Sequence, residues 1–342
     1  MDIRANFSLR PYNTFGIDVR ARHFAEFRSL GELQELLEYI EDKQELRKND
    51  TMVLGGGSNV LFTSDVDGWV IKNDLPGIEQ VGTRDGKVLV RAGAGENWHG
   101  FVMHCLDQGW SGMENLSLIP GNVGATPIQN IGAYGVDMAQ IFEVLEAWDI
   151  EDRKLVRFTR SDCSFGYRES YFKHEGKNRF IILSVTYCLD TVPVFHTTYG
   201  PIQEELVKMG VAELSVRAIS DAVIRIRSSK LPDPKHIGNA GSFFKNPVVS
   251  KEAYGIFLQK YPDMVGHELP EGGVKLAAGW LIEKAGWKGF RRGDAGCHQR
   301  QALVLVNYGN ATGTQILQLS QEIMDDVHHK FGVHLEREVN IY

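Results

Sequence analysis

The segment from Gly238 to Pro247, GNAGSFFKNP, combines residue types that suit a reactive pocket. Its one hydroxyl, Ser242, lies between a glycine run and two phenylalanines, and Lys245 and Asn246 follow closely. Glycine lets a backbone approach a ligand, aromatic rings exclude water, and a few convergent polar groups then orient the ligand. We therefore predict that this segment takes part in chemistry.

Ser242 has three interpretations from its residue type and spacing. With Lys245 it matches the S-x-x-K pattern of penicillin-binding proteins, in which serine is an acyl-transfer nucleophile, although the companion S-D-N and K-T-G motifs are missing. Alternatively, its hydroxyl donates a proton to a carbanion, which requires neighbours that stabilise the resulting alkoxide. A serine that only caps a helix or a turn is the third possibility.

Two glycine-rich loops form a second feature. Gly55 to Asn59 follows the apolar run Thr51 to Leu54, and a longer loop spans Ile119 to Gly135. Glycine permits turns that direct several backbone N–H groups at one phosphate. Neither the Rossmann nor the P-loop spacing is present, and a plain hairpin is the alternative for the first loop. Together the loops could line the two sides of one extended cofactor.

Arg168 and Glu338 are weaker candidates on local pattern alone. Arg168 follows Phe165 to Tyr167 in a turn-like context, where a planar guanidinium suits a carboxylate or the electron-rich edge of a ring. A surface arginine is the alternative. Glu338 belongs to the C-terminal segment Val333 to Tyr342, whose alternation places it on one strand face together with Glu336.

Composition limits the classes of function. A chain of 342 residues exceeds the usual single core, so we expect two or three domains. The net charge of -7 argues against a nucleic-acid partner, and no apolar run is long enough to span a membrane. The N-terminus lacks a secretory pattern, so we expect a cytoplasmic protein. The four cysteines are dispersed without metal-ligand spacing, and the pair Cys297 and His298 is best explained as a buried thiol beside a polar residue.

Hydrophobic periodicity predicts a mixture of helices and strands. Ser29 caps a helix with apolar residues from Leu33 to Ile40, and two more helices are predicted, from Val274 to Ala285 and from Ile316 to Phe331. Short runs rich in β-branched residues predict strands at 51–54, 60–62, 69–71, 87–91, 144–150, 155–159, 180–189, 222–226 and 301–307.

The ordered motifs resemble the UDP-N-acetylenolpyruvoylglucosamine reductase family over nearly the whole chain. The likeness runs from NTFG at Asn13 to EREV at Glu336. It includes LGGGSN, IPGNVGATPIQNIGAYG, FGYR, SSKLPDP, GNAGSFFKNP, KLAAGWLIEKAG and QALVLVN.

This resemblance implies an α+β fold with an FAD-binding part of the vanillyl-alcohol-oxidase type. The implied domains are residues 1–67 and 68–215 for FAD, with the final strand 335–342 joined to the latter, and residues 216–334 for substrate. It also implies non-covalent FAD, NADPH as reductant, the enolpyruvyl ether of UDP-N-acetylglucosamine as substrate, and a monomer.

The same resemblance implies roles for individual residues. Ser242 matches the proton donor, Arg168 the arginine near flavin and substrate, and Glu338 the C-terminal glutamate. Substrate-side positions are Tyr134, Tyr167, Lys230, Asn246 and Gln301, together with Tyr199, which matches the tyrosine of the closing loop in the longer, type I branch. The implied cofactor-binding residues are Gly55, Gly56, Gly57, Ser58, Asn59, Gly121, Gly124, Ala125, Thr126, Gln129 and Asn130.

One position departs from the family pattern. Arg337 stands where the family usually has proline, which leaves the packing of the last segment open. The competing hypotheses are a flavin-dependent alcohol oxidase of the same fold, a serine acyl-transfer enzyme and a non-catalytic nucleotide-binding protein.

Overall fold

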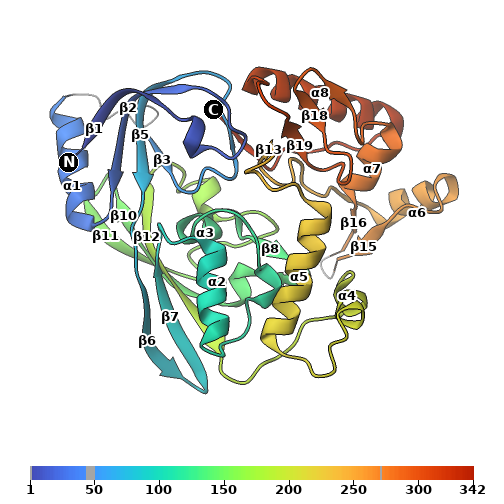
Figure 1. The fold of residues 1–342 in the computed structure, drawn as a ribbon, viewed down its shortest axis with the longest axis horizontal. Coiled ribbons are helices and arrows are strands. Elements are labelled where there is room, and N and C mark those ends of the chain that lie inside the picture. The colour runs from blue at the N-terminus through green and yellow to red at the C-terminus, as the bar shows by residue number, and fades with distance from the viewer. Residues whose placement is uncertain (1, 44–50, 270–271) are drawn as a thin grey trace. The chain divides into compact units, whose positions relative to one another are not determined.

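The computed structural model describes residues 2–43, 51–269 and 272–342. Its contacts divide the chain into two compact units (Figure 1). The first unit contains residues 1–7, 21–57 and 66–229, and the second contains residues 8–20, 58–65 and 230–342. The three-part domain division remains a prediction.

The first unit contains two sheets. A four-stranded sheet has the order β1-β2-β5-β3, with β1 at Ile3–Ser8, β2 at Arg20–Phe27, β5 at Val66–Asn73 and β3 at Thr51–Leu54. Strand β5 pairs parallel with both β2 and β3. A five-stranded antiparallel sheet has the order β11-β10-β12-β7-β6, with strands at Lys154–Thr159, Phe142–Asp149, Phe180–Asp190, Lys87–Gly93 and Ile78–Arg84. A small hairpin joins β8 (Gly132–Ala133) to β9 (Val136–Asp137).

Two helices, at Leu30–Asp42 and Trp98–Asp107, each bury one apolar face against strands of these sheets. The helices of this unit are α1 (Leu30–Asp42), α2 (Trp98–Asp107), α3 (Thr126–Gln129), α4 (Ile202–Lys208) and α5 (Val216–Lys230), whose last residue falls in the second unit. The Ser29 side chain accepts a hydrogen bond from the Glu32 N–H and caps α1, which confirms the predicted N-terminus. Helices α2 and α5 lie side by side, joined by an ion pair between Asp107 and Arg217 (Figure 1).

The second unit is built from short strands and three helices. Its four-stranded sheet has the order β13-β19-β18-β17, at Gly238–Asn239, Leu305–Asn307, Ala295–Cys297 and Arg291–Arg292. A three-stranded sheet has the order β14-β16-β15, at Val248–Val249, Val274–Leu276 and Gly266–Glu268. The helices are α6 (Lys251–Lys260), α7 (Ala278–Ala285) and α8 (Gly313–Phe331), and α8 begins with a capping box formed by Thr312 and Gln315.

Two predicted elements differ from the structure, one in its type and one in its first residue. Residues 222–226 are helical within α5, because the buried Val216, Ile219, Val223 and Ile226 recur at helical spacing, and this periodicity prevails over the strand preference of β-branched residues. The helix predicted from residue 274 begins only at Ala278, since β16 pairs with β14 and β15 on its two sides.

The last segment also differs from the sequence-based expectation. Asn340–Ile341 forms β20, which pairs parallel with β4 (Val60–Leu61) in the second unit and takes no part in the sheets within residues 68–215. Arg337 donates hydrogen bonds from its guanidinium to Ser320 and Gln321 of α8, at 2.8 and 2.7 Å. The arginine that replaces the family's proline therefore anchors the terminal segment.

Candidate functional site

Ser242 and Glu338 lie on neighbouring backbone segments of the second unit. The Glu338 N–H donates to the carbonyl of Phe243, the residue after Ser242, at 2.8 Å. Ser242 follows Gly241, which has a positive φ of 71° and donates its N–H to the Asn239 side chain at 3.0 Å. Both Ser242 and Glu338 are partly exposed, so a ligand can reach them. The fold thus brings together two residues that are far apart in the sequence.

Lys245 forms an ion pair with Glu336. Its ammonium donates to the Glu336 carboxylate at 2.5 Å, and its residue is buried while the Glu336 side chain is 70% exposed. Because its ammonium is engaged in this ion pair, Lys245 is poorly placed to serve as the base that the S-x-x-K interpretation of Ser242 requires. Glu336 is a surface ion-pair partner, whereas Glu338 is more deeply placed.

Asn246 and Gln301 both lie near the start of α7. The Asn246 side-chain oxygen accepts from the Ala278 N–H at 3.0 Å, and the Gln301 carboxamide oxygen lies 3.1 Å from where a side chain at Gly279 would begin. The Asn246 oxygen therefore holds a helix terminus, and its amide N–H groups are what it can offer to a ligand. Lys230 is exposed at the C-terminal end of α5.

Arg168 is fixed by the second glycine loop within the first unit. Its guanidinium donates to the Asn130 carbonyl at 3.2 Å and to the Gly132 carbonyl, and it lies over the Tyr167 ring at 5.2 Å. The Asn130 side chain in turn donates to the Gly166 carbonyl at 3.0 Å. The predicted arginine and the predicted cofactor loop are therefore one connected structure.

Two further tyrosines lie near this cluster. Tyr134 has a positive φ of 51°, and burial raises the pKa of its hydroxyl. Tyr199 packs against the next residue, Gly135, since a β-carbon at Gly135 would lie 3.1 Å from the β-carbon of Tyr199. Tyr167 and Tyr199 are both about two-fifths exposed, at 42% and 43%. Tyr167 and Tyr199, which the resemblance places on the substrate side, are thus accessible to a ligand.

Arg227 on α5 is a charged residue that the sequence interpretation missed. Burial lowers the pKa of its guanidinium, and the nearby Arg168 lowers this pKa further. Within residues 2–43, 51–269 and 272–342, Arg227 pairs with no carboxylate, and its contact is a 3.3 Å hydrogen bond to the Leu118 carbonyl. Burial also lowers the pKa of His99, and the charge of Arg227 adds to that effect. The guanidinium groups of Arg168 and Arg227 can together hold an anion. The helical spacing of Arg227 and Lys230 was the available signal.

The two glycine loops pack directly against each other in the first unit. A β-carbon at Gly56 would lie 2.6 Å from the Asn122 side-chain oxygen and 2.9 Å from the Gly121 α-carbon. Gly57 and Gly121 have positive φ angles of 63° and 113°. Ser58 and Asn59, which complete the first loop, belong to the second unit, where the Asn59 side chain donates to the Glu338 carbonyl at 3.2 Å.

The backbone N–H groups of the two loops also suit a phosphate group. The backbone N–H groups of Gly56 and Asn122 donate to no other residue in the described part of the chain. Such N–H groups beside glycines with positive φ can bind phosphate oxygens. Thr126 has another role, because its buried hydroxyl is bonded to the Val123 carbonyl and the Tyr187 hydroxyl, both at 2.8 Å. Gly124 packs so closely on Ala94 that a β-carbon there would lie 2.6 Å from that of Ala94.

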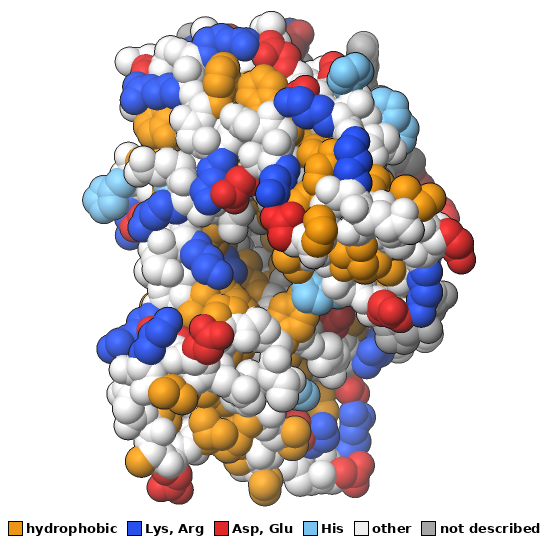
Figure 2. Space-filling model, turned by 90° about the vertical axis from the view of Figure 1, so that its right-hand side faces the viewer, with side chains coloured by type: hydrophobic (Ala, Val, Ile, Leu, Met, Phe, Trp, Pro, Cys, Tyr) orange, Lys and Arg blue, Asp and Glu red, His pale blue; other side chains and the backbone are white. Residues whose placement is uncertain are grey.

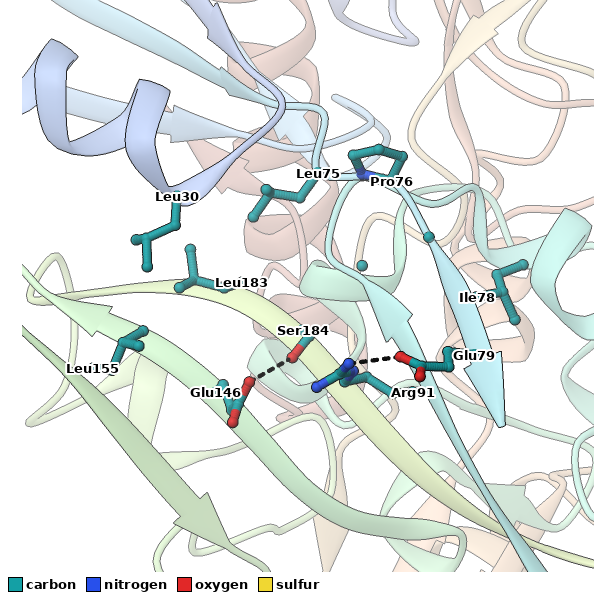
Figure 3. Close-up of a pocket in the computed structure, with 12 residues that line it drawn as sticks. Leu30, Leu75, Pro76, Ile78, Glu79, Arg91, Glu146, Leu155, Leu183 and Ser184 are labelled. Atoms are coloured by element: carbon teal, nitrogen blue, oxygen red, sulfur yellow. Dashed lines mark hydrogen bonds and ion pairs between the residues drawn. The ribbon is translucent and has the colours of Figure 1, made fainter. Parts of the chain in front are cut away.

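A cavity of about 490 Å³ lies elsewhere, on the first unit (Figure 3). Its leucines at positions 30, 75, 155 and 183 surround polar groups that are paired with each other, namely Arg91 with Glu79 and Ser184 with Glu146. No predicted site residue lines this cavity. We therefore assign it no part in the candidate site.

Other features of the described residues argue against a thiol nucleophile and a metal site. Burial raises the pKa of Cys297 to about 12, which makes its thiol a poor nucleophile at neutral pH. No group of three or more potential metal ligands is present in the described ranges, nor any helix there that is long and apolar enough to cross a membrane. Basic and acidic side chains are interspersed on the face drawn in Figure 2, which gives that face no single sign of charge.

Two family models match this chain. Residues 21–158 match the FAD binding domain, and residues 233–342 match the C-terminal domain of UDP-N-acetylenolpyruvoylglucosamine reductase.

Curated relatives match along the whole chain. A UDP-N-acetylenolpyruvoylglucosamine reductase of Flavobacterium johnsoniae is 50% identical over all of both chains. Reductases of the same name from Amoebophilus asiaticus and Pseudomonas syringae are each 48% identical over all of this chain and 99% of theirs.

A solved structure supports the fold. The crystal structure of UDP-N-acetylenolpyruvylglucosamine reductase from Thermus caldophilus matches with a TM-score of 0.68 and 23% identity, over 100% of this chain and 98% of that chain. Together with the FAD binding domain match, this confirms the predicted α+β fold class.

Proposed function

Because the chain belongs to the family of UDP-N-acetylenolpyruvoylglucosamine reductases, we propose that it reduces the enolpyruvyl ether of UDP-N-acetylglucosamine to UDP-N-acetylmuramate, with NADPH as reductant. This is a step in the synthesis of peptidoglycan precursors. The full-length relatives at 48% to 50% identity support the proposal. A monomeric state and a cytoplasmic location remain predictions.

FAD is the cofactor of this oxidoreductase. The glycine loops fit its pyrophosphate, because the backbone N–H groups of Gly56 and Asn122, where the loops meet, donate to no other described residue. We propose that residues 55–59 and 121–130 hold it. When bound, FAD supplies the hydride chemistry that links NADPH to the enolpyruvyl group.

Arg168 and Arg227 provide the positive charge for an anionic substrate. Reduction of the enolpyruvyl double bond places negative charge on the carbon next to the carboxylate and on the carboxylate itself. A guanidinium stabilises this charge best when it is already in place, and Arg168 is held by two backbone carbonyls. Arg227, which has no carboxylate partner among the described residues, adds charge for the same anion.

Ser242 donates the proton that completes the reduction, and Glu338 shares in the delivery of that proton. The observation that carries this assignment is the 2.8 Å hydrogen bond from the Glu338 N–H to the Phe243 carbonyl, which holds the glutamate beside the serine segment. A hydroxyl is a weak acid, so its effectiveness depends on such neighbours.

The two half-reactions test this assignment. Ser242→Ala should leave reduction of the flavin by NADPH unchanged and slow its reoxidation by the enolpyruvyl nucleotide by more than the roughly 10² to 10⁴-fold effect typical of lost acid catalysis. Stopped-flow absorbance measures both steps. Ser250→Ala, which removes the N-cap of α6, is the control and should leave both rates unchanged. Equal slowing of both steps in Ser242→Ala would assign the serine a structural role.

A further inference from the structure

Asn115 holds two separate backbone segments with one side chain. It lies in a short 3-10 helix, Glu114–Leu116, and is 1% exposed. Its side-chain NH₂ donates to the Tyr134 carbonyl at 2.9 Å and to the His196 carbonyl at 2.8 Å. Because a carboxamide has two N–H groups, both of its donors are used for this bridge.

The His196 carbonyl belongs to a largely exposed segment, residues 191–200, which we call the connecting loop. Its side chains include Val192 and Val194, which are 76% and 59% exposed. Two backbone hydrogen bonds between Ser111 and Asp190, of 2.9 and 3.0 Å, fix the start of the loop. Beyond that start Phe195 packs partly buried against apolar residues of the first unit, and the Asn115 bridge is a further restraint on the path of the loop.

The other end of the bridge is the turn that carries Tyr134. Tyr134 and Gly135 both have positive φ, and Tyr199 of the connecting loop packs on Gly135. Gly132, at the start of this turn, accepts a hydrogen bond from Arg168. One amide therefore links the position of Tyr199 to the Tyr134 and Arg168 cluster.

The side-chain oxygen of Asn115 carries a free-energy cost that packing alone would not explain. The Asn115 side-chain oxygen is buried and accepts from no residue in the described part of the chain. Leaving a buried acceptor unpaired is unfavourable, and an apolar side chain of similar size would avoid that penalty. The two donated hydrogen bonds are what this position gains from an asparagine.

We propose that Asn115 is a positioning residue, which holds the connecting loop and its Tyr199 against the Tyr134 turn in the arrangement that the sugar-nucleotide substrate contacts. The substrate part of this inference rests on the proposed function. The anchoring part concerns the protein alone and can be tested without turnover.

Limited proteolysis tests the anchoring in the FAD-loaded full chain. Chymotrypsin cleaves after aromatic residues, and the connecting loop contains Phe195 and Tyr199. Asn115→Ala should speed cleavage at these two sites roughly tenfold, as expected for the loss of two neutral hydrogen bonds. Asn73→Ala is the matched control, because it also removes a buried carboxamide, one that bonds the Ile182 carbonyl away from the loop, and its cleavage rate at these two sites should equal that of the wild type. Fragment masses identify the sites.

Steady-state and single-step kinetics test the substrate part. Asn115→Ala should raise the KM for the enolpyruvyl nucleotide about tenfold while flavin reduction by NADPH stays within about twofold of the wild-type rate. Asn115→Asp keeps the shape but removes both donors, so it should show the same pattern. A residue that only stabilises the core would affect both steps or the retention of flavin.

Specific results would overturn the inference. Wild-type cleavage rates in both Asn115 variants would refute the anchoring, and faster cleavage with an unchanged KM would refute the effect on substrate. Loss of bound flavin in both variants would show a structural role instead. If the wild-type protein itself does not turn over the nucleotide, the proposed function fails, and the proteolysis result still decides the anchoring.

Discussion

Gly56→Ala tests whether the contact between the two glycine loops creates the FAD site. The added methyl group would lie 2.9 Å from the Gly121 α-carbon and 2.6 Å from the Asn122 side-chain oxygen. Carbon atoms in contact lie about 3.5 to 4.0 Å apart, so the backbone of residue 121 must move by at least roughly 0.6 Å. The Asn122 side chain can rotate, but a backbone α-carbon cannot move alone.

The size of the effect follows from this overlap. Forcing an extra methyl group into a packed position costs about 1 to 3 kcal/mol. If the loops must be in contact to bind FAD, this strain weakens FAD binding by roughly 5- to 150-fold. Gly82→Ala is a control outside the two loops, since a β-carbon there has its nearest neighbour, the Leu89 side chain, at an ordinary 3.9 Å.

The assay is titration of the apoprotein with FAD, followed by flavin fluorescence, together with thermal unfolding of each apoprotein. We expect Gly82→Ala to bind FAD like the wild type and Gly56→Ala to bind it more weakly. Equal FAD affinity in all three proteins would refute the assignment of the loop contact to the cofactor site. So would a Gly56→Ala protein that is less stable as apoprotein but binds FAD normally.

Three further predictions concern the cofactor and two carboxylates. The purified protein should carry one non-covalent FAD, which acid precipitation releases intact, and recovery of FMN would contradict this. Glu338→Gln should lower kcat strongly with little change in substrate Kd, while Glu336→Gln, which changes the exposed partner of the buried Lys245, should be nearly silent in kinetics. Equal losses would reassign the catalytic carboxylate. Burial raises the pKa of Glu114, so its ionisation disfavours the folded state as pH rises above the ordinary glutamate pKa. The stability gained by Glu114→Gln should therefore be larger at pH 8 than at pH 5, whereas the exposed Glu38→Gln should show no such dependence in thermal unfolding.

The sequence by itself determined the elements whose signals are local. The Ser29 cap, the apolar spacing of α8 and four strands of the five-stranded sheet, β7, β10, β11 and β12, follow from periodicity and capping, because these depend on neighbours a few residues apart. Strand β6 of that sheet was not predicted. The ordered motifs also identified the family and its cofactor, and the FAD binding domain match agrees. Residues 222–226 show the limit of such reasoning, since helical periodicity and strand preference disagreed there.

Only the tertiary structure decided which polar groups are partners. Glu336 and Glu338 share a strand pattern, yet Lys245 binds one of them, while the other lies beside the segment of Ser242. Asn115 and Arg227 gave no motif of their own, because their significance depends on carbonyls and charges contributed by distant parts of the chain. Hydrogen bonding and desolvation act over a few ångströms in space, and the distance between two residues along the sequence does not specify them.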